Sequence, residues 1–441
     1  MKDLSPSQSS RRQFLRNASC FGIPFILPSG LWSASLQGAG PNSRIQLGLI
    51  GMGKRMQGLL RSFSKFDDVQ MVAVNDVVSA RLTDGAQRVT QAYEQGKRTT
   101  GDLLATNDFR KIVESDGVDA VVISTPDHWH AIQSILAAKA GKHVYCEKPL
   151  TRTIGEGRNV VLAARENGIV YQTGSQQRTE YGGKFRTAVE CIRNGRIGDL
   201  KKIHIGVGGP AIPDDLPEQP LPEGIDWEAW LGPAPSRGFH EVLCPIGLHS
   251  HFPQWRRYRE YAGGGLSDIG AHHFDIAQWA LGRDDTGPVS IVPPKDPAAT
   301  SGLTFRYADG LEMVHGAYEG RNGCHFIGTK GYLFVDRKEI LSTPGEILET
   351  PLTGSDWRLD EISENHQRNW VDCIHSGEKP VADVEIGHRT NTICALGNIG
   401  YWLNRDLEWD PESERFQNDD EANELVTPEE REPWNGIVSA T

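Results

Sequence analysis

The spacing of hydrophobic residues changes character twice along the chain. A moderately apolar run, broken by prolines and a glycine, occupies the first forty residues. From residue 43 nearly continuous apolar runs alternate with amphipathic stretches, and beyond residue 170 short apolar runs are separated by turn residues. We therefore predict a leader over residues 1–40, a first domain over 43–170 and a second domain over 171–441.

The first domain is predicted to be α/β, with a parallel sheet. Its apolar runs contain few polar residues, as expected of strands that are covered on both faces. Helical patterns lie between them, and this alternation gives parallel strands with right-handed crossovers. The predicted strands are 45–50, 69–75, 118–124 and 142–146, and the predicted helices are 55–66, 131–139 and 155–166.

The second domain is predicted to be α+β, with a mostly antiparallel open sheet. Short apolar runs recur at hairpin spacing, with turn signals such as Ala308-Asp309-Gly310 between them. The predicted strands are 203–207, 302–307, 311–317, 324–328 and 332–335, and late helices are predicted over 364–376 and 385–403. The proline-rich stretch 210–235 is a long loop, which we expect to line a site or a subunit contact.

Composition fits two packed domains behind a leader. The chain has 441 residues, of which 38% are hydrophobic and 24% are charged. Its net charge is −12, and no basic stripe is visible, so we expect no nucleic-acid ligand.

The leader carries an export motif. Ser10-Arg11-Arg12-Gln13-Phe14-Leu15 resembles a twin-arginine signal, and small residues near Ala34 and Ala39 offer a cleavage site. The apolar run is too interrupted for a membrane span, which needs about 20 apolar residues. We therefore expect an exported, periplasmic protein that engages the twin-arginine machinery and has no membrane span when mature. A chance arginine pair before a disordered tail is the alternative.

Six cysteines follow the leader, and none forms a C-x-x-C pair. This spacing indicates neither a zinc site nor a redox dithiol. Because the twin-arginine route carries proteins folded in the reducing cytoplasm, we expect buried free thiols at Cys146, Cys191, Cys244, Cys324, Cys373 and Cys394.

A glycine turn follows the first predicted strand. In Gly51-Met52-Gly53-Lys54-Arg55-Met56 the first glycine suits the tight turn, and the second lets a pyrophosphate approach the helix N-terminus. Met56 replaces the third glycine of this fingerprint, so an ordinary glycine turn remains the alternative.

Asp76 ends the second predicted strand, 25 residues after Gly51. An acid at about this offset binds the ribose hydroxyls of NAD and repels the 2′-phosphate of NADP. NAD is therefore favoured over NADP, although Lys54, Arg55 and Arg81 are nearby cations. A surface aspartate at a strand end is the alternative.

Two further motifs follow predicted strands. They are Ser124-Thr125-Pro126-Asp127-His128-Trp129-His130 and Cys146-Glu147-Lys148-Pro149-Leu150-Thr151. The carboxyl ends of parallel strands are where ligands of open α/β sheets bind. Near a positively charged nicotinamide, the ammonium form of Lys148 would be disfavoured, which suits it to polarise or deprotonate a hydroxyl. A solvated surface lysine is the alternative.

A glycine-rich turn leads into a predicted helix over Gly263 to Asp275. Asp268, His272 and Asp275 would share one face of that helix. Histidine commonly takes a hydroxyl proton during oxidation, and a carboxylate one turn away can orient it. A metal site from the same three side chains and a purely structural capped helix are the alternatives.

Together these motifs resemble the family of glucose-fructose oxidoreductase, inositol dehydrogenase and the rhizopine-catabolism oxidoreductases, in its exported form. The resemblance extends from Ile45 to Trp434. It implies a Rossmann domain, an α+β domain that often mediates homo-oligomer formation, and a reaction centre of Lys148, Asp268 and His272. It also implies that the dinucleotide touches Gly51, Gly53, Arg55, Asp76, Thr125, His128 and Glu147.

The leading hypothesis is hydride transfer between bound NAD and an alcohol carbon of a sugar, cyclitol or glycoside. In this hypothesis His272 is the general base, Lys148 lowers the pKa of the substrate hydroxyl, and Asp268 positions them. Little free NAD is found outside the cytoplasm, so we expect a tightly bound cofactor. Two alternatives stay open: redox-neutral glycoside cleavage by transient oxidation, and a non-catalytic NAD-binding sensor or scaffold. No metal is expected.

Overall fold

The computed structural model describes residues 44–96, 98, 101–359, 363–428 and 430–438. The leader, its arginine pair and its cleavage site lie outside the described residues. None of the helices in the described part combines the length and the apolar character that a membrane crossing needs.

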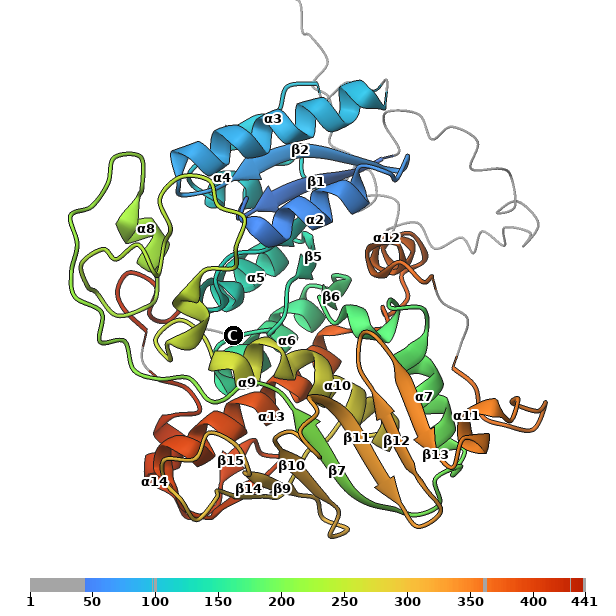
Figure 1. The fold of residues 1–441 in the computed structure, drawn as a ribbon. Helices are drawn as coiled ribbons and strands as arrows, with labels where there is room; N and C mark the ends of the chain where they lie inside the picture. The colour runs from blue at the N-terminus through green and yellow to red at the C-terminus, as the bar shows by residue number, and fades with distance from the viewer. Residues whose placement is uncertain (1–43, 97, 99–100, 360–362, 429, 439–441) are drawn as a thin grey trace, which may run out of the picture. The chain divides into compact units, whose positions relative to one another are not determined.

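The first sheet has six parallel strands (Figure 1). Its strand order is β3-β2-β1-β4-β5-β6, so the direction of strand addition reverses between β1 and β4. The strands are β1 (Ile45–Ile50), β2 (Val69–Asn75), β3 (Leu104–Thr106), β4 (Ala120–Ile123), β5 (His143–Cys146) and β6 (Tyr171–Thr173). This is the order of a Rossmann sheet, whose ligands bind at the reversal point. The predicted parallel sheet is confirmed.

Helices cover both faces of this sheet. One face packs against α5 (His130–Lys139) and α6 (Ile154–Glu166), and the other against α2 (Lys54–Phe63) and α3 (Ser79–Gln95). Helix α6 begins with a capping box, in which Thr153 and Glu156 satisfy each other's backbone N–H groups. The whole of β4 is buried, as its apolar sequence predicts.

The late part of the chain returns to the first sheet. Helix α12 (His366–Ser376) packs against α2, and Trp370, which is fully buried, lies edge-on to Phe63. The Arg368 guanidinium donates two hydrogen bonds of 2.8 Å to Asp68 beside β2. Strand β6 also belongs to this sheet, although it starts just beyond residue 170. The domain boundaries at 43–170 and 171–441 stay a prediction.

The second sheet is mixed and mostly antiparallel. Its nine described strands have the order β13-β12-β11-β7-β10-β9-β8-β14-β15. Within this sheet only the described strands β7 and β10 pair in parallel. They are β7 (Leu200–Gly206), β8 (Ser290–Val292), β9 (Thr304–Arg306), β10 (Glu312–His315), β11 (Gly323–Gly328), β12 (Tyr332–Val335), β13 (Ile340–Thr343), β14 (Leu407–Asp410) and β15 (Arg415–Phe416). The predicted fold class is therefore confirmed.

The core of the second domain lies between this sheet and three helices. They are α7 (Lys184–Arg193), α10 (Gly270–Leu281) and α13 (Val384–Leu403), and they pack their apolar side chains against the strands. Five short helices also occur in the described residues: α4 (Arg110–Val113), α8 (Trp227–Leu231), α9 (Gly264–Asp268), α11 (Glu346–Glu349) and α14 (Asp420–Glu424). All six cysteines after the leader are buried free thiols, as predicted.

Candidate active site

The glycine turn lies at the reversal point of the first sheet. Gly51 has a φ of +86°, and a Cβ built on it would lie 2.9 Å from the carbonyl oxygen of Ser124 at the end of β4. A side chain on Gly53, by contrast, would meet no atom within 4 Å. The turn therefore needs glycine at 51 for its own packing, whereas Gly53 keeps space open above the helix end.

The N-terminus of α2 suits an anion. No side chain caps it, and its first turn holds no acidic residue. Its backbone N–H groups and the helix dipole therefore favour a negatively charged ligand group there. Met56, which replaces the third glycine of the fingerprint, is fully buried in the core between α2 and the sheet.

Asp76 holds the glycine turn through hydrogen bonds to backbone N–H groups. Its carboxylate accepts hydrogen bonds from the backbone N–H groups of Met52, at 2.8 Å, and Val78, at 2.9 Å. Burial raises the pKa of Asp76, and the Arg81 guanidinium acts against that rise. The Arg81 side chain donates to backbone carbonyls of Pro245 and Gly247. Both side chains thus have structural partners as well as a place in the wall of a cavity.

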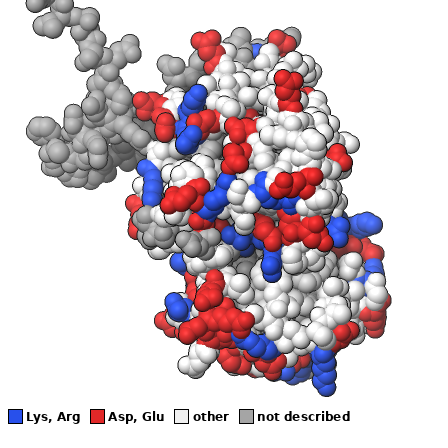
Figure 2. Space-filling model, turned by 90° about the vertical axis from the view of Figure 1, so that its left-hand side faces the viewer, with Lys and Arg blue, Asp and Glu red and all other residues white. Residues whose placement is uncertain are grey.

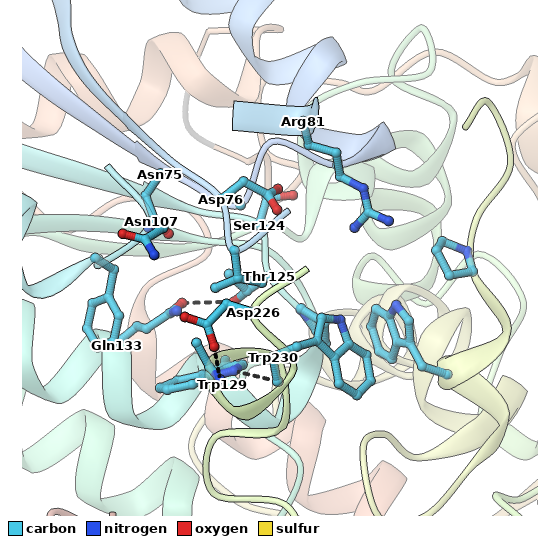
Figure 3. A pocket seen from close by; sticks show the side chains of 18 of the residues that line it. Asn75, Asp76, Arg81, Asn107, Ser124, Thr125, Trp129, Gln133, Asp226 and Trp230 are labelled. Carbon is cyan, nitrogen blue, oxygen red and sulfur yellow. Dashed lines mark hydrogen bonds between the residues drawn. The ribbon is translucent and has the colours of Figure 1, made fainter. Parts of the chain in front are cut away.

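The first cavity has a volume of about 360 Å³ and opens over the ends of β1, β2 and β4. Figure 3 shows Asn75, Asp76, Ser124 and Thr125 on the sheet side of it. Gly51 and Gly53 also line this cavity. An open glycine cradle, a free helix N-terminus and a buried acid at the next strand end fit a dinucleotide.

A long segment forms the other wall of this cavity. We call residues 207–263, between β7 and α9 (Gly264–Asp268), the covering loop. It contains α8 (Trp227–Leu231), and its Asp226 and Trp230 line the cavity, as does Trp434 from the end of the chain (Figure 3 shows the first two). The stretch 210–235, which we expected to line a site or a subunit contact, thus contributes to the wall of this cavity.

The covering loop is anchored to the first sheet. Ile225 bridges to Val78, and the N–H of Ser79 donates to the Gly224 carbonyl at 2.9 Å. The Trp129 indole donates to the Trp230 carbonyl at 3.0 Å. Thirteen buried apolar residues form a cluster here, almost all of them from the loop. The loop is thus folded around its own apolar cluster and forms a packed wall of the cavity.

A second cavity, of about 230 Å³, adjoins the first. Five residues line both: Arg55, Ser124, Thr125, Phe252 and Arg256. The three predicted catalytic residues, Lys148, Asp268 and His272, line only the second cavity. The structure therefore brings together the residues that we predicted for the reaction, next to those that we predicted for the cofactor.

Lys148 and Asp268 form a close ion pair. The Lys148 ammonium donates to the Asp268 carboxylate and to the Asp268 backbone carbonyl, both at 2.6 Å. Burial alone would raise the pKa of Asp268, but the Lys148 ammonium and the Arg256 guanidinium hold it below its usual value. The ammonium thus keeps one further proton to donate.

His272 is a buried neutral imidazole. Burial lowers its pKa well below 6.5, and the positive charges of Lys148 and Arg337 lower it further. Its Nδ1 atom has no hydrogen-bond partner among the described residues. The Gln177 side-chain amide donates to its backbone carbonyl at 3.1 Å. A ring that is neutral at ordinary pH is able to accept a proton.

Glu147 is held between two side chains. Its carboxylate accepts hydrogen bonds from Arg55, at 2.7 Å, and from the amide of Gln176, at 2.9 Å. A Cβ at position 174 would lie 2.8 Å from this carboxylate, so Gly174 makes room for it. Glu147 lines the second cavity, and Arg55 lines both.

One residue that we predicted for the cofactor lies away from the cavities. His128 lines neither; its Nε2 atom is 3.0 Å from the Trp230 carbonyl, and its ring packs against Trp230 and Tyr261. The prediction that His128 touches the dinucleotide is therefore not supported by its placement. Its position instead supports the covering loop.

The expectation that Asp275 shares one helical face with Asp268 and His272 is wrong. The helix breaks at Ile269, between α9 and α10, so the three side chains do not follow one continuous helical face. Asp275 is fully buried in an ion pair of 2.8 Å with Arg178. No cluster of metal-ligating side chains occurs among the described residues, so this group offers no metal site there.

Among the acidic, basic and histidine side chains that line the second cavity, four were not predicted as site residues: Asp127, His130, Arg256 and Arg337. His130 bridges the two strand-end motifs, with its ring nitrogens 2.8 Å from the Pro149 carbonyl and 3.1 Å from the Thr125 carbonyl. Burial raises the pKa of Asp127 to about 8. Asp127 and His130 stood within a recognised motif, whereas no local signal distinguishes Arg256 or Arg337.

Two family models match the chain. One, described as "Oxidoreductase family, NAD-binding Rossmann fold", matches residues 45–175, and another, "Oxidoreductase family, C-terminal alpha/beta domain", matches residues 211–436. The chain belongs to this oxidoreductase family. It is the glucose-fructose oxidoreductase, inositol dehydrogenase and rhizopine-catabolism family that the motifs resemble, and this member has the family's NAD-binding Rossmann domain.

Individual relatives of this oxidoreductase align over part of their length. A 1,5-anhydro-D-fructose reductase from Ensifer adhaerens is 31% identical over 217 residues, 49% of this chain and 52% of the relative. A glycosyl hydrolase family 109 protein from Solibacter usitatus is 36% identical over 218 residues, 47% of each chain. The chain thus spans about half the length of these curated relatives.

Solved structures show the same fold. The crystal structure of an aldose-aldose oxidoreductase from Caulobacter crescentus, complexed with glycerol, superposes with a TM-score of 0.56. The match covers 83% of this chain and 99% of that chain, at 17% sequence identity. At that identity the likeness concerns the fold alone.

Acid is expected to destabilise the protein through its buried histidines. Burial lowers the pKa of His128 to about 3, and of His273, His315 and His366 to about 4. Below about pH 6.5 the unfolded chain therefore binds more protons than the folded protein, so the free energy of unfolding falls with pH. Five carboxyl groups with raised pKa values act in the opposite direction, but eleven histidines among the described residues have lowered pKa values; the five are Asp76, Asp127, Glu180, Asp275 and Glu430.

Calorimetry between about pH 6.5 and pH 4.5 tests this expectation. The melting temperature should fall steadily across the interval, and His315→Gln should make the fall less steep. A melting temperature that stays level in the wild-type protein would contradict it.

Proposed function

We propose that this protein is an NAD-dependent oxidoreductase that acts on a CH–OH group of a sugar, cyclitol or glycoside. The observation that carries the proposal is the junction of the two cavities, where the dinucleotide cradle meets Lys148, Asp268 and His272. A bound nicotinamide would accept or return a hydride there. The family, the reductase relative and the volume of the second cavity support a small sugar as substrate.

The chain's own residues divide the proton chemistry between them. Lys148, fixed by two hydrogen bonds to Asp268, donates to the substrate oxygen and lowers the pKa of that hydroxyl. His272, a neutral imidazole that lines the second cavity, takes the proton. Asp268 positions the ammonium. Phe252 and Arg256 of the covering loop line both cavities at this junction.

The cofactor is proposed to be NAD, retained through turnover. The covering loop, which is anchored by its apolar cluster, and Trp434 line the cavity, and these contacts support slow exchange of a bound dinucleotide. Retention also suits an exported, periplasmic enzyme that carries its cofactor through the twin-arginine machinery. We propose that a second substrate or a redox partner regenerates it, and that the protein forms a homo-oligomer.

Asp76→Ala is expected to weaken NAD binding at least about tenfold and to reduce the preference for NAD over NADP, because the ribose hydroxyls lose an acceptor and the 2′-phosphate loses its repulsion. Asp108→Asn, which removes another carboxylate that lines the same cavity, is the matched control. Titration calorimetry with each nucleotide measures both effects. An unchanged preference would contradict the NAD assignment.

A second candidate is redox-neutral glycoside cleavage, in which transient oxidation acidifies a neighbouring C–H bond. The glycosyl hydrolase family 109 relative favours it, as does the anchored covering loop that lines the cofactor cavity. Incubating the purified protein with glycosides distinguishes the two. Cleavage without added nucleotide and without net reduction supports the second candidate, whereas net reduction of the bound nucleotide supports the first.

A further inference from the structure

The second cavity carries more positive than negative charge. Four basic residues line it: Arg55, Lys148, Arg256 and Arg337. Three acidic residues line it: Asp127, Glu147 and Asp268. The chain as a whole has a net charge of −12, and Figure 2 shows lysine and arginine mixed with aspartate and glutamate on the face that it displays. The excess of cations is therefore local to the two adjoining cavities, because the first cavity is also lined by more cations than carboxyl groups.

Direct ion pairs neutralise two of the four cations. Arg55 pairs with Glu147 at 2.7 Å, and Lys148 pairs with Asp268 at 2.6 Å. The third carboxyl, Asp127, has a pKa raised to about 8 by burial, so near neutral pH it is mostly protonated. Two guanidinium groups, those of Arg256 and Arg337, are thus left in excess.

Arg256 faces the cofactor as well as the second cavity. Its Nε atom lies 3.7 Å from the Asp268 carboxylate, its guanidinium lies over the Trp255 ring, and it lines both cavities. Its charge is therefore available to the dinucleotide. For this reason Arg256 alone does not indicate the chemistry of the substrate.

Arg337 lines only the second cavity. It lies in the turn between β12 and β13, where its Nε atom donates to the Gln177 amide oxygen at 3.0 Å and its guanidinium lies over the Tyr181 ring. Among the described residues no carboxylate lies within 4 Å of it, and its two Nη groups have no hydrogen-bond partner. Gln177 in turn donates to the backbone carbonyl of His272. An unpaired guanidinium is thus fixed beside the predicted base.

We propose that Arg337 binds a carboxylate of the substrate, so that the preferred substrate is an acidic sugar, such as a hexuronic acid or its glycoside. A guanidinium presents two parallel N–H groups to a carboxylate, and this pairing is stronger than a neutral hydrogen bond. The cavity, of about 230 Å³, leaves room for a single sugar ring with its acid group. This inference rests on the proposed function and specifies its substrate.

Two measurements on the protein with its bound nucleotide test the proposal. The first is binding of glucuronate and galacturonate against glucose and galactose, by titration calorimetry. The second is reduction of the bound nucleotide by the same four sugars. Arg337→Gln removes the guanidinium, and Lys338→Gln, its exposed neighbour in the same turn, removes one positive charge without touching the cavity.

The wild-type protein should bind the uronates at least about tenfold more tightly than the neutral hexoses. Arg337→Gln should abolish that difference by weakening uronate binding far more than hexose binding, whereas Lys338→Gln should preserve it. Equal binding of both sugar classes by the wild-type protein overturns the proposal, as does an equal loss for both in Arg337→Gln. Reduction by the neutral hexoses in those cases would leave the proposed oxidoreductase function intact. Binding of uronates without any reduction would instead contradict that function alone.

Discussion

Lys148→Met is expected to lower turnover about 10²- to 10⁴-fold and to leave the content of bound NAD unchanged. The methionine fills similar space but cannot donate to the substrate oxygen. Lys148 lines only the second cavity, so its removal leaves the dinucleotide wall intact. The Asp268 carboxylate keeps Arg256 within 3.7 Å, which limits the cost of leaving that charge without its lysine.

Lys201→Met is the matched control, because Lys201 is exposed on β7, far from both linings. Its turnover should equal that of the wild-type protein. The measurements are the rate of reduction of the bound nucleotide and the amount of nucleotide released on denaturation. Full activity in Lys148→Met with a full complement of NAD would reject the catalytic assignment and favour the scaffold hypothesis.

The second large effect should distinguish two glycines of the same turn, Gly51 and Gly53, which are separated by Met52. At Gly51 a methyl group meets the backbone of Ser124, and the φ of +86° disfavours any side chain, so Gly51→Ala should lower the free energy of unfolding by about 1–2 kcal/mol or more. At Gly53 the φ is −69° and a methyl group meets nothing. Gly53→Ala should therefore keep the stability of the protein without its cofactor.

Gly53→Ala, which should not change stability, should instead weaken the binding of the cofactor. The methyl group of Gly53→Ala enters the space above the α2 N-terminus, so the pyrophosphate would lose hydrogen bonds to backbone N–H groups, and the affinity for NAD should fall at least about tenfold. Chemical unfolding of the nucleotide-free proteins and titration with NAD give the two quantities. Unaltered NAD affinity in Gly53→Ala would show that the dinucleotide does not lie over this turn.

Much of the first sheet follows from local sequence, but some of its elements do not. The strands over 45–50 and 69–75 agree with prediction to the residue, because continuous apolar runs have few other ways to be buried. Helix α3 was not predicted, since its stripe of Val89 and Tyr93 is diluted by polar residues. Strands β3 and β6 have three residues each, which is too short for a periodic signal.

The candidate site likewise contains residues that local sequence predicts and residues that it does not. Gly51, Thr125 and Lys148 each lie in a local motif that directly follows a predicted strand. The structure places all three at the two cavities. Arg256 and Arg337 reach the second cavity through the covering loop and a hairpin turn of the second sheet. Their place depends on tertiary packing across more than one hundred residues of chain, which no spacing rule encodes.

Anaerobic mixing of the purified protein with a panel of sugars, sugar acids and glycosides tests the central claim most directly. The absorbance of the bound nucleotide is followed through a single turnover, with no nucleotide added. We predict that at least one sugar reduces the retained NAD stoichiometrically and that Lys148→Met slows this step. A protein that retains NAD but shows no spectral change and cleaves no glycoside with any member of the panel would contradict the account.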